Sequence, residues 1–152
     1  FAFGLASVQF KTRRSVLLCL VFSVAFNGAH FFFLDRPGAG ALMLLVGVRY
    51  LVALATTDRK VMFLFFLITG VTFAATFKSP LSLLALCGSL FGTYGSFQPL
   101  GNKVRLYFMG GNVCWLLHNA LAWTPVGTIM EASFLISSIV GYWRFYGSPF
   151  RR

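Results

Sequence analysis

Residues 106–130, LYFMGGNVCWLLHNALAWTPVGTIM, contain no charged side chain. A helix that crosses the hydrocarbon core of a bilayer needs about 20 mostly apolar residues, so this stretch is long enough to contain one. Three further stretches also lack charge: 15–34, 61–77 and 79–102. Uncharged runs of this length exclude soluble loops and indicate spanning helices. We therefore predict an all-α transmembrane protein.

The composition of the chain excludes a soluble domain. Of the 152 residues, 58% are hydrophobic and only 11% are charged, whereas soluble proteins carry roughly a quarter charged residues. The net charge of +10 does not indicate nucleic-acid binding, because Lys and Arg occur as pairs or triplets between apolar runs and form no continuous patch. The expected partner of this surface is the lipid bilayer.

Turn-forming residues divide the apolar sequence into seven segments. Pro and Gly mark the turns, for example in Asp35-Arg36-Pro37-Gly38 and in Thr124-Pro125-Val126-Gly127. Because the first segment is shorter than a membrane span, we expect the first helix to be incomplete in this sequence. The predicted spans are 1–10, 15–34, 37–57, 61–77, 80–97, 104–123 and 126–146.

The distribution of Lys and Arg predicts the orientation of these spans. Cytoplasmic loops of membrane proteins carry an excess of Lys and Arg. With seven spans and the N-terminus outside, ten basic residues fall in inside segments and only Arg36 and Lys78 in outside loops. We therefore predict an N-out, C-in topology. The ten inside residues are Lys11, Arg13, Arg14, Arg59, Lys60, Lys103, Arg105, Arg144, Arg151 and Arg152.

The chain resembles itself at an offset of 88 residues. His30 is followed seven residues later by Pro37, and His118 is followed seven residues later by Pro125. This spacing predicts two parallel three-helix repeats, 1–57 and 80–152, joined by a linker helix in 58–79, with a short basic tail at the C-terminus. Parallel repeats with a binding site at their interface are typical of one class of transporters.

Polar side chains on the sixth span are candidate substrate-binding residues. Asn112, Trp115, His118 and Asn119 fall on about a third of the helix circumference at 3.6 residues per turn. Asn side chains in membrane bundles also bond across helices without a further function. Trp and His side chains likewise serve in packing. Both interpretations stay open for this face.

Four further residues complete the candidate set, because polar and ionisable groups inside a membrane are expensive and usually functional. Asn27 and His30 share one stripe of the second span, Arg49 lies near the middle of the third, and Glu131 lies on the seventh. Arg49 and Glu131 either pair as a structural salt bridge or handle a substrate or proton.

Glycines on the fifth and sixth spans predict close packing of the two helices. Gly88-x-x-x-Gly92 is a small-residue motif, and Gly110 and Gly111 follow on the sixth span. Such residues let helix backbones approach each other in a membrane.

The sequence offers little for catalysis or metal binding. The three cysteines lie inside apolar runs without metal-ligand spacing, and the chain has only two histidines. A catalytic metal normally needs three protein ligands. We expect no cofactor and no enzymatic activity.

Several stretches resemble the bacterial inner-membrane proteins of the YgjV type. They are Cys114-Trp115-Leu116-Leu117-His118-Asn119, the segment from Gly127 to Phe134, and His30-Phe31-Phe32-Phe33-Leu34. The family is similar, more distantly, to the SWEET and PQ-loop group, which implies paired three-helix units around a central pocket. In sugar carriers of that group Asn and Trp clamp the solute, which implies such a role for Asn27, Asn112, Trp115 and Asn119. The Pro-Gln turn is inverted here as Gln98-Pro99, so the resemblance does not extend to a sugar substrate.

These observations predict a carrier for a small polar solute in a bacterial inner membrane. The solute would bind in a central pocket, and one three-helix unit would rock against the other. The alternative is a receptor or assembly protein on the same fold that binds a ligand without alternating access. The sequence leaves open whether the protein forms a homo-oligomer.

Overall fold

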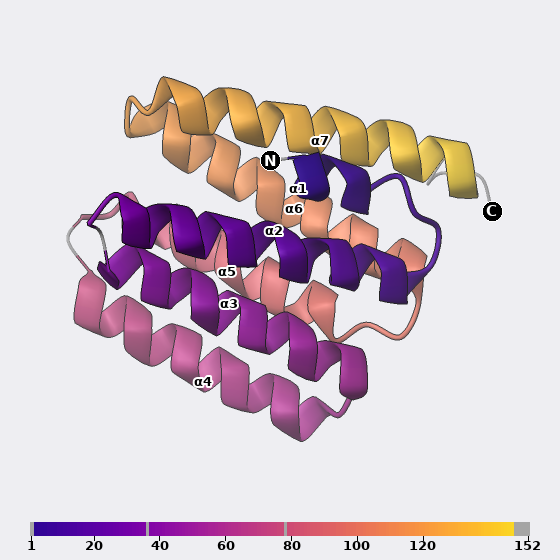
Figure 1. The fold of residues 1–152 in the computed structure, drawn as a ribbon, viewed down its shortest axis with the longest axis horizontal. Coiled ribbons are helices and arrows are strands. Elements are labelled where there is room, and N and C mark those ends of the chain that lie inside the picture. Colours follow the sequence, from indigo (N-terminus) through magenta and orange to yellow (C-terminus); the bar gives the residue numbers. More distant parts are fainter. Residues whose placement is uncertain (1, 36, 78, 148–152) are drawn as a thin grey trace.

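The computed structural model describes residues 2–35, 37–77 and 79–147, and all secondary structure within them is helical. All helices begin and end within three residues of the predicted spans, so the all-α fold is confirmed (Figure 1). Arg36, Lys78, Arg151 and Arg152, used above to predict the topology, lie outside the described residues. The helices are α1 (Ala2–Ser7), α2 (Arg13–Phe33), α3 (Pro37–Ala55), α4 (Arg59–Thr76), α5 (Ser82–Ser96), α6 (Gly101–Leu121) and α7 (Pro125–Tyr146).

Local sequence explains where several helices begin. The Thr12 side chain accepts a hydrogen bond from the Ser15 amide at the start of α2, and Asp58 accepts one from the Lys60 amide at the start of α4. These side chains satisfy amides that have no partner inside the helix. Pro125 is the first residue of α7, where its missing N–H leaves no hydrogen bond unmade.

The surface of the bundle is apolar, as expected for a protein solvated by lipid. Exposed apolar side chains include Phe33, Leu67, Val126 and Ile129. By length and composition α2, α4 and α7 can each cross a membrane, whereas the apolar part of α3, Gly40–Ala55, is shorter. The seven-span topology and its orientation stay predictions.

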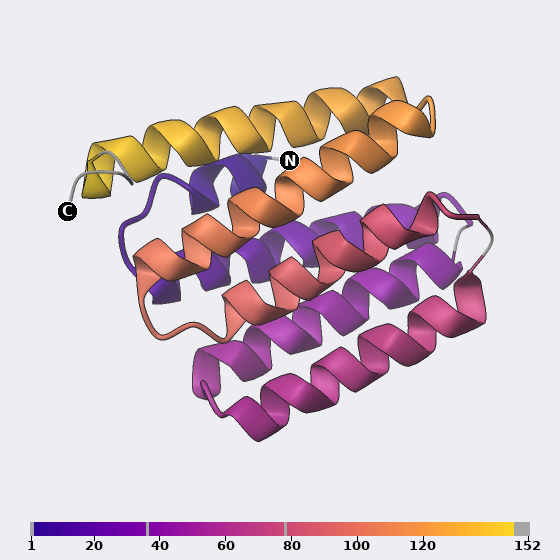
Figure 2. The same ribbon diagram turned by 180° about the vertical axis from the view of Figure 1, so that it is seen from behind.

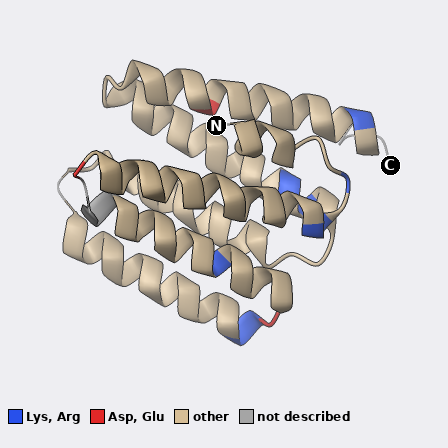
Figure 3. Cartoon of the chain, viewed as in Figure 1, with Lys and Arg blue, Asp and Glu red and all other residues tan. Residues whose placement is uncertain are grey.

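The helices run back and forth between two ends of the bundle (Figures 1 and 2). We call the end that holds the α1–α2, α3–α4 and α5–α6 connections the basic end, because most of the described Lys and Arg residues lie there (Figure 3). The opposite end, with the α2–α3, α4–α5 and α6–α7 turns, is called the far end. Along the bundle α2 packs against α3, α5 against α6, and α6 against α7.

The largest cluster of buried apolar residues lies near the basic end. It contains side chains from the start of α2, the end of α3, the start of α4 and the residue after α5. Its members pack closely, for example Phe65 and Phe97 with ring centroids 5.8 Å apart. The bundle is therefore filled at this end. The cluster comprises Leu17, Tyr50, Ala53, Met62, Phe65 and Phe97.

The α2–α3 and α6–α7 turns begin with the same backbone geometry at the predicted offset of 88 residues. Asp35 (φ 54°) and Trp123 (φ 53°) both adopt the left-handed conformation, which is uncommon for residues other than glycine. The preceding amides, of Leu34 and Ala122, donate to the carbonyls of His30 and His118. This correspondence agrees with an internal repeat, while the arrangement of two complete three-helix units stays a prediction.

Candidate functional site

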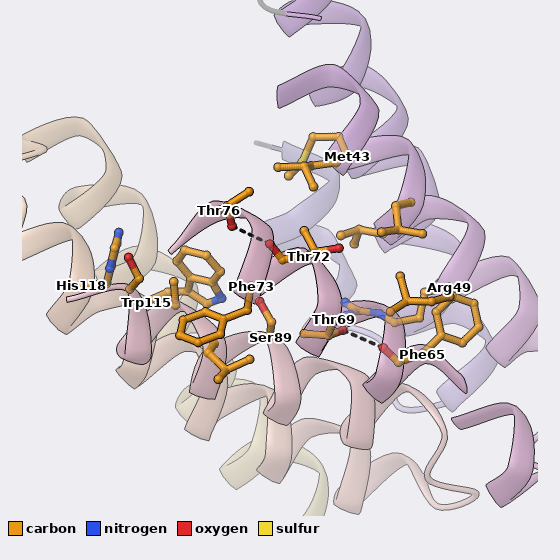
Figure 4. Close-up of a pocket in the computed structure, with 17 residues that line it drawn as sticks. Met43, Arg49, Phe65, Thr69, Thr72, Phe73, Thr76, Ser89, Trp115 and His118 are labelled. Carbon is orange, nitrogen blue, oxygen red and sulfur yellow. Dashed lines mark hydrogen bonds between the residues drawn. The ribbon is translucent and has the colours of Figure 1, made fainter. Parts of the chain in front are cut away.

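A cavity of about 290 Å³ lies between α3, α4, α5 and α6. Its walls come mostly from the parts of these helices nearest the far end, so the cavity lies beside the buried apolar cluster, with which it shares Phe65. Figure 4 shows Arg49 and Phe65 on one side of it and Trp115 and His118 on the other. The lining residues are Leu42, Met43, Leu45, Val46, Arg49, Phe65, Ile68, Thr69, Thr72, Phe73, Thr76, Ser82, Ala85, Leu86, Ser89, Trp115 and His118.

The cavity has the character of a small-molecule site. Such sites are concave and mostly apolar, with a few polar groups that orient the ligand, and they begin at roughly 300 Å³. Here aliphatic and aromatic side chains dominate the walls, and the polar groups are five hydroxyls, one imidazole, one indole N–H and one guanidinium. No carboxylate is among the lining residues.

Arg49 is the charged residue of the cavity. Its side chain is 8% exposed, and its Nη1 donates a hydrogen bond of 2.8 Å to Thr93 Oγ1 on α5. The guanidinium carbon lies 5.1 Å from the centre of the Tyr50 ring, a cation–π contact that offsets part of the desolvation. The buried Nε has no hydrogen-bond partner among the described residues. The positive charge is therefore only partly satisfied by the protein.

Trp115 and His118 line the cavity from α6, one helical turn apart. Their rings meet edge to face, with centroids 5.6 Å apart. The Nδ1 atom of His118 lies 3.1 Å from the carbonyl oxygen of Leu81, the residue before α5. A carbonyl oxygen only accepts, so Nδ1 donates this hydrogen bond.

Of the eight residues proposed from the sequence, the structure brings together Arg49, Trp115 and His118. Asn119 follows His118 but points elsewhere, because successive helical side chains diverge by about 100° at 3.6 residues per turn. Its Oδ1 accepts a hydrogen bond from Thr124, and a β-carbon on Gly127 would meet its amide at 3.0 Å. Asn119 therefore packs in the α6–α7 turn.

The remaining four candidates lie outside the cavity lining. Asn27, Asn112 and Glu131 are partly buried, and His30 is exposed. Glu131 belongs to α7, which contributes no lining residue, whereas Arg49 bonds to α5. The described residues contain no Arg49–Glu131 salt bridge, so the pairing considered from the sequence is not formed.

Helix α4, predicted to be the linker helix, supplies polar groups that the sequence interpretation missed. Thr69, Thr72 and Thr76 all line the cavity, and their spacing of three and four residues places them on one face of the helix. The hydroxyls of Thr69 and Thr76 donate to the carbonyls of Phe65 and Thr72. A threonine stripe on an otherwise apolar helix was the signal available in the sequence.

The predicted glycine seam between α5 and α6 supports the Trp115 wall of the cavity. A β-carbon on Gly88 would lie 3.3 Å from the carbonyl oxygen of Gly111 and 2.7 Å from the indole of Trp115. The Gly88→Ala variant is expected to displace the indole and to lose about 1–3 kcal/mol of stability through overpacking. Thermal unfolding in detergent measures the loss. Gly92→Ala is the control, since its β-carbon would meet Arg49 at an ordinary 3.4 Å, and an equal loss in both variants would contradict the expectation.

Arg105, at the start of α6, ties the second half of the chain to the α1–α2 connection. Its side chain is 1% exposed. Nη1 donates to the carbonyl oxygen of Val8 at 2.5 Å, and Nη2 donates to that of Phe10. The guanidinium also lies over the ring of Phe145, 5.2 Å from its centre. Such charge-assisted hydrogen bonds are about twice as strong as neutral ones.

Arg13, at the start of α2, makes the reverse connection. Its Nε donates to the carbonyl oxygen of Gln98 at 2.7 Å, and its Nη2 donates to those of Ser96 at 3.1 Å and of Ala53. Ser96 is the last residue of α5 and Gln98 follows shortly after it, both in the second half of the chain. We call the two contact sets, Arg13 with Ser96 and Gln98 and Arg105 with Val8 and Phe10, the arginine clamps.

The clamps are related by the same offset as the turns. Val8 and Ser96 are 88 residues apart, and so are Phe10 and Gln98. Each half of the chain therefore offers carbonyls at equivalent positions to an arginine from the other half. From the sequence, Arg13 and Arg105 were interpreted only as topological charges of inside loops. In the structure their side chains also join the two halves of the chain at the basic end.

Comparison with known proteins identifies the chain. The family of bacterial inner membrane proteins named Imp-YgjV matches residues 1–148. The chain belongs to this family. Inner membrane protein YgjV of Escherichia coli (strain K12) is 33% identical over 139 residues, which cover 90% of this chain and 73% of that protein. No solved structure matches the chain.

Membership of the YgjV family agrees with the physical character of the structure. Its members are bacterial inner membrane proteins, and the apolar surface of the bundle suits that environment. The resemblance to the YgjV family noted from the sequence is thus confirmed, and so is the localisation.

Proposed function

We propose that this YgjV-family protein is a carrier for a small polar solute, which enters the cavity from the far end. The observation that carries the proposal is the asymmetry of the bundle. The cavity occupies the half toward the far end, whereas the buried apolar cluster and both arginine clamps fill the basic end. A binding site that is blocked toward one end of a bundle is what a carrier needs in one of its two states.

Transport would require the basic end to open while the far end closes. Parallel-repeat carriers achieve this by rocking one unit against the other around a fixed site. The arginine clamps join the first and second halves of the chain, so these contacts would break in the opening step. The carrier operates without covalent chemistry in this proposal, and its oligomeric state stays open.

Cysteine accessibility tests the proposal without knowledge of the solute. All three native cysteines are replaced by alanine, and Ser89→Cys is introduced in the cavity wall. A carrier exchanges between two states, so a membrane-impermeant maleimide should label this cysteine from both faces of the membrane, in right-side-out and in inside-out vesicles. Labelling is expected to be slower from the face of the basic end, because the buried apolar cluster lies between that end and the cavity.

Two control cysteines identify the faces. Trp123→Cys lies in the exposed α6–α7 turn at the far end, and Lys103→Cys is exposed at the basic end. Each should react from one face only, which also tests the predicted N-out, C-in orientation. Labelling of Ser89→Cys from the far-end face alone, under all conditions, would favour the alternative of a receptor without alternating access.

A further inference from the structure

We propose that the cavity binds a small organic carboxylate, with the negative group at Arg49 and the apolar body against Phe73 and Trp115. This inference deepens the proposed function, because it names the chemical class of the solute. It rests on the charge of the cavity, on the surroundings of Arg49 and on the apolar walls.

The first argument is the uncompensated charge of Arg49. The chain contains three carboxylates, Asp35, Asp58 and Glu131, and none of them lines the cavity. Asp58 caps α4 at the basic end. A buried charge normally has a partner of opposite sign, since an isolated one is expensive to desolvate. An anion in the cavity would provide that partner.

The second argument is the donor capacity that Arg49 retains. A guanidinium has five N–H donors in a planar fork that fits a carboxylate. Among the described residues, the Thr93 hydroxyl accepts a hydrogen bond from Nη1 of Arg49, and the buried Nε of Arg49 has no acceptor. A β-carbon on Gly92 would lie 3.4 Å from Nη2, so the glycine limits crowding on that side of the guanidinium.

The third argument distinguishes an organic anion from an inorganic one. Most of the lining residues between Arg49 and His118 are aliphatic or aromatic, such as Ile68, Phe73 and Leu86, although hydroxyl groups interrupt this wall. An inorganic oxyanion at Arg49 would leave the apolar part of the wall unused and would still lose much of its hydration on entering the cavity. A carboxylate with a short aromatic or aliphatic body fits both parts of the cavity, and a volume of about 290 Å³ limits it to a small molecule.

Titration calorimetry of the purified protein in a non-ionic detergent tests the inference with three probes: sodium benzoate, its neutral analogue benzamide, and sodium sulfate. Benzoate should bind at least about tenfold more tightly than the other two, because only benzoate has both a charge for Arg49 and a ring for the apolar wall. Arg49→Gln should weaken benzoate binding by about ten- to a hundredfold, whereas Arg49→Lys should retain part of it.

The controls separate this result from general effects of charge and folding. Arg14→Gln removes an exposed cation at the basic end and should leave benzoate affinity within about twofold. Melting temperatures show whether Arg49→Gln is folded, and the three-probe comparison on the unchanged protein does not depend on any variant. Equal binding of benzamide, tighter binding of sulfate, or an unaltered affinity in folded Arg49→Gln would each overturn the proposal. The calorimetry measures binding and does not depend on transport. If benzoate binds but Ser89→Cys is labelled from one face only, the carrier proposal is refuted and the carboxylate site is still supported.

Discussion

The double variant Arg13→Gln/Arg105→Gln is expected to open the basic end of the bundle. In this variant the Ser89→Cys reporter should react with maleimide from the basic-end face roughly a hundredfold faster than in the parent. The two arginines donate to four carbonyls across the halves of the chain, those of Ser96, Gln98, Val8 and Phe10. Losing about 1.5 kcal/mol per arginine from the closed state corresponds to roughly tenfold each.

The symmetry of the clamps gives this prediction a second requirement. Because the carbonyl positions are related by an offset of 88 residues, each single variant should account for a comparable part of the effect. Arg14→Gln/Arg59→Gln is the matched control, since both side chains are exposed at the same end and the change in charge is identical. A folded double variant that reacts at the parental rate from the basic-end face would show that the clamps do not hold the closed state.

The helices of this chain were predictable from the sequence because hydrocarbon imposes a simple length rule. The charged residues and prolines that bound the apolar runs also bound the helices, as at Pro37 and Pro125, which each begin one. The offset that pairs His30 with His118 reappears in the matching turns at Asp35 and Trp123. The positions of charged residues, prolines and histidines along the chain were therefore sufficient to predict the helix boundaries and the matching turns.

The site was only partly predictable, because helix periodicity shows which residues share a face but not what that face meets. Trp115 and His118 line the cavity, whereas Asn119, on the same predicted face, packs in a turn against Gly127. The partner of Arg49 is Thr93, 44 positions further along the chain, and no spacing in the sequence relates the two. Long-range pairing of this kind depends on how α3 and α5 pack.

The same limitation explains the interpretation of Arg13 and Arg105. Both lie where the positive-inside rule places basic residues, and that rule accounts for their charge without assigning them a contact. In the structure their acceptors are backbone carbonyls, which every residue possesses and which therefore leave no sequence signature. Only the fold identifies which carbonyls are within reach.

Gly141→Ala is expected to be among the most destabilising single methyl additions in the protein. Gly141 is buried on α7, and a β-carbon there would overlap the carbonyl oxygen of Val8 and lie 2.8 Å from Nη1 of Arg105. Because the obstructing atom is backbone, the α1–α2 connection must move. Overpacking of about 1–3 kcal/mol would add to the loss of a charge-assisted hydrogen bond of about 1.5–3 kcal/mol. We therefore expect a total loss of about 2.5–6 kcal/mol in reversible unfolding in detergent.

Gly70→Ala on α4 is the matched control for this substitution, because a β-carbon at Gly70 would meet no atom within 4 Å. Both substitutions replace a helical glycine by alanine, so both gain about the same helix propensity, up to about 1 kcal/mol. The difference between the two variants therefore isolates the contact with Val8 and Arg105. Gly141→Ala should also accelerate basic-end labelling of Ser89→Cys, because it displaces one clamp. Equal stability of the two alanine variants would mean that α7 does not hold the α1–α2 connection against Arg105.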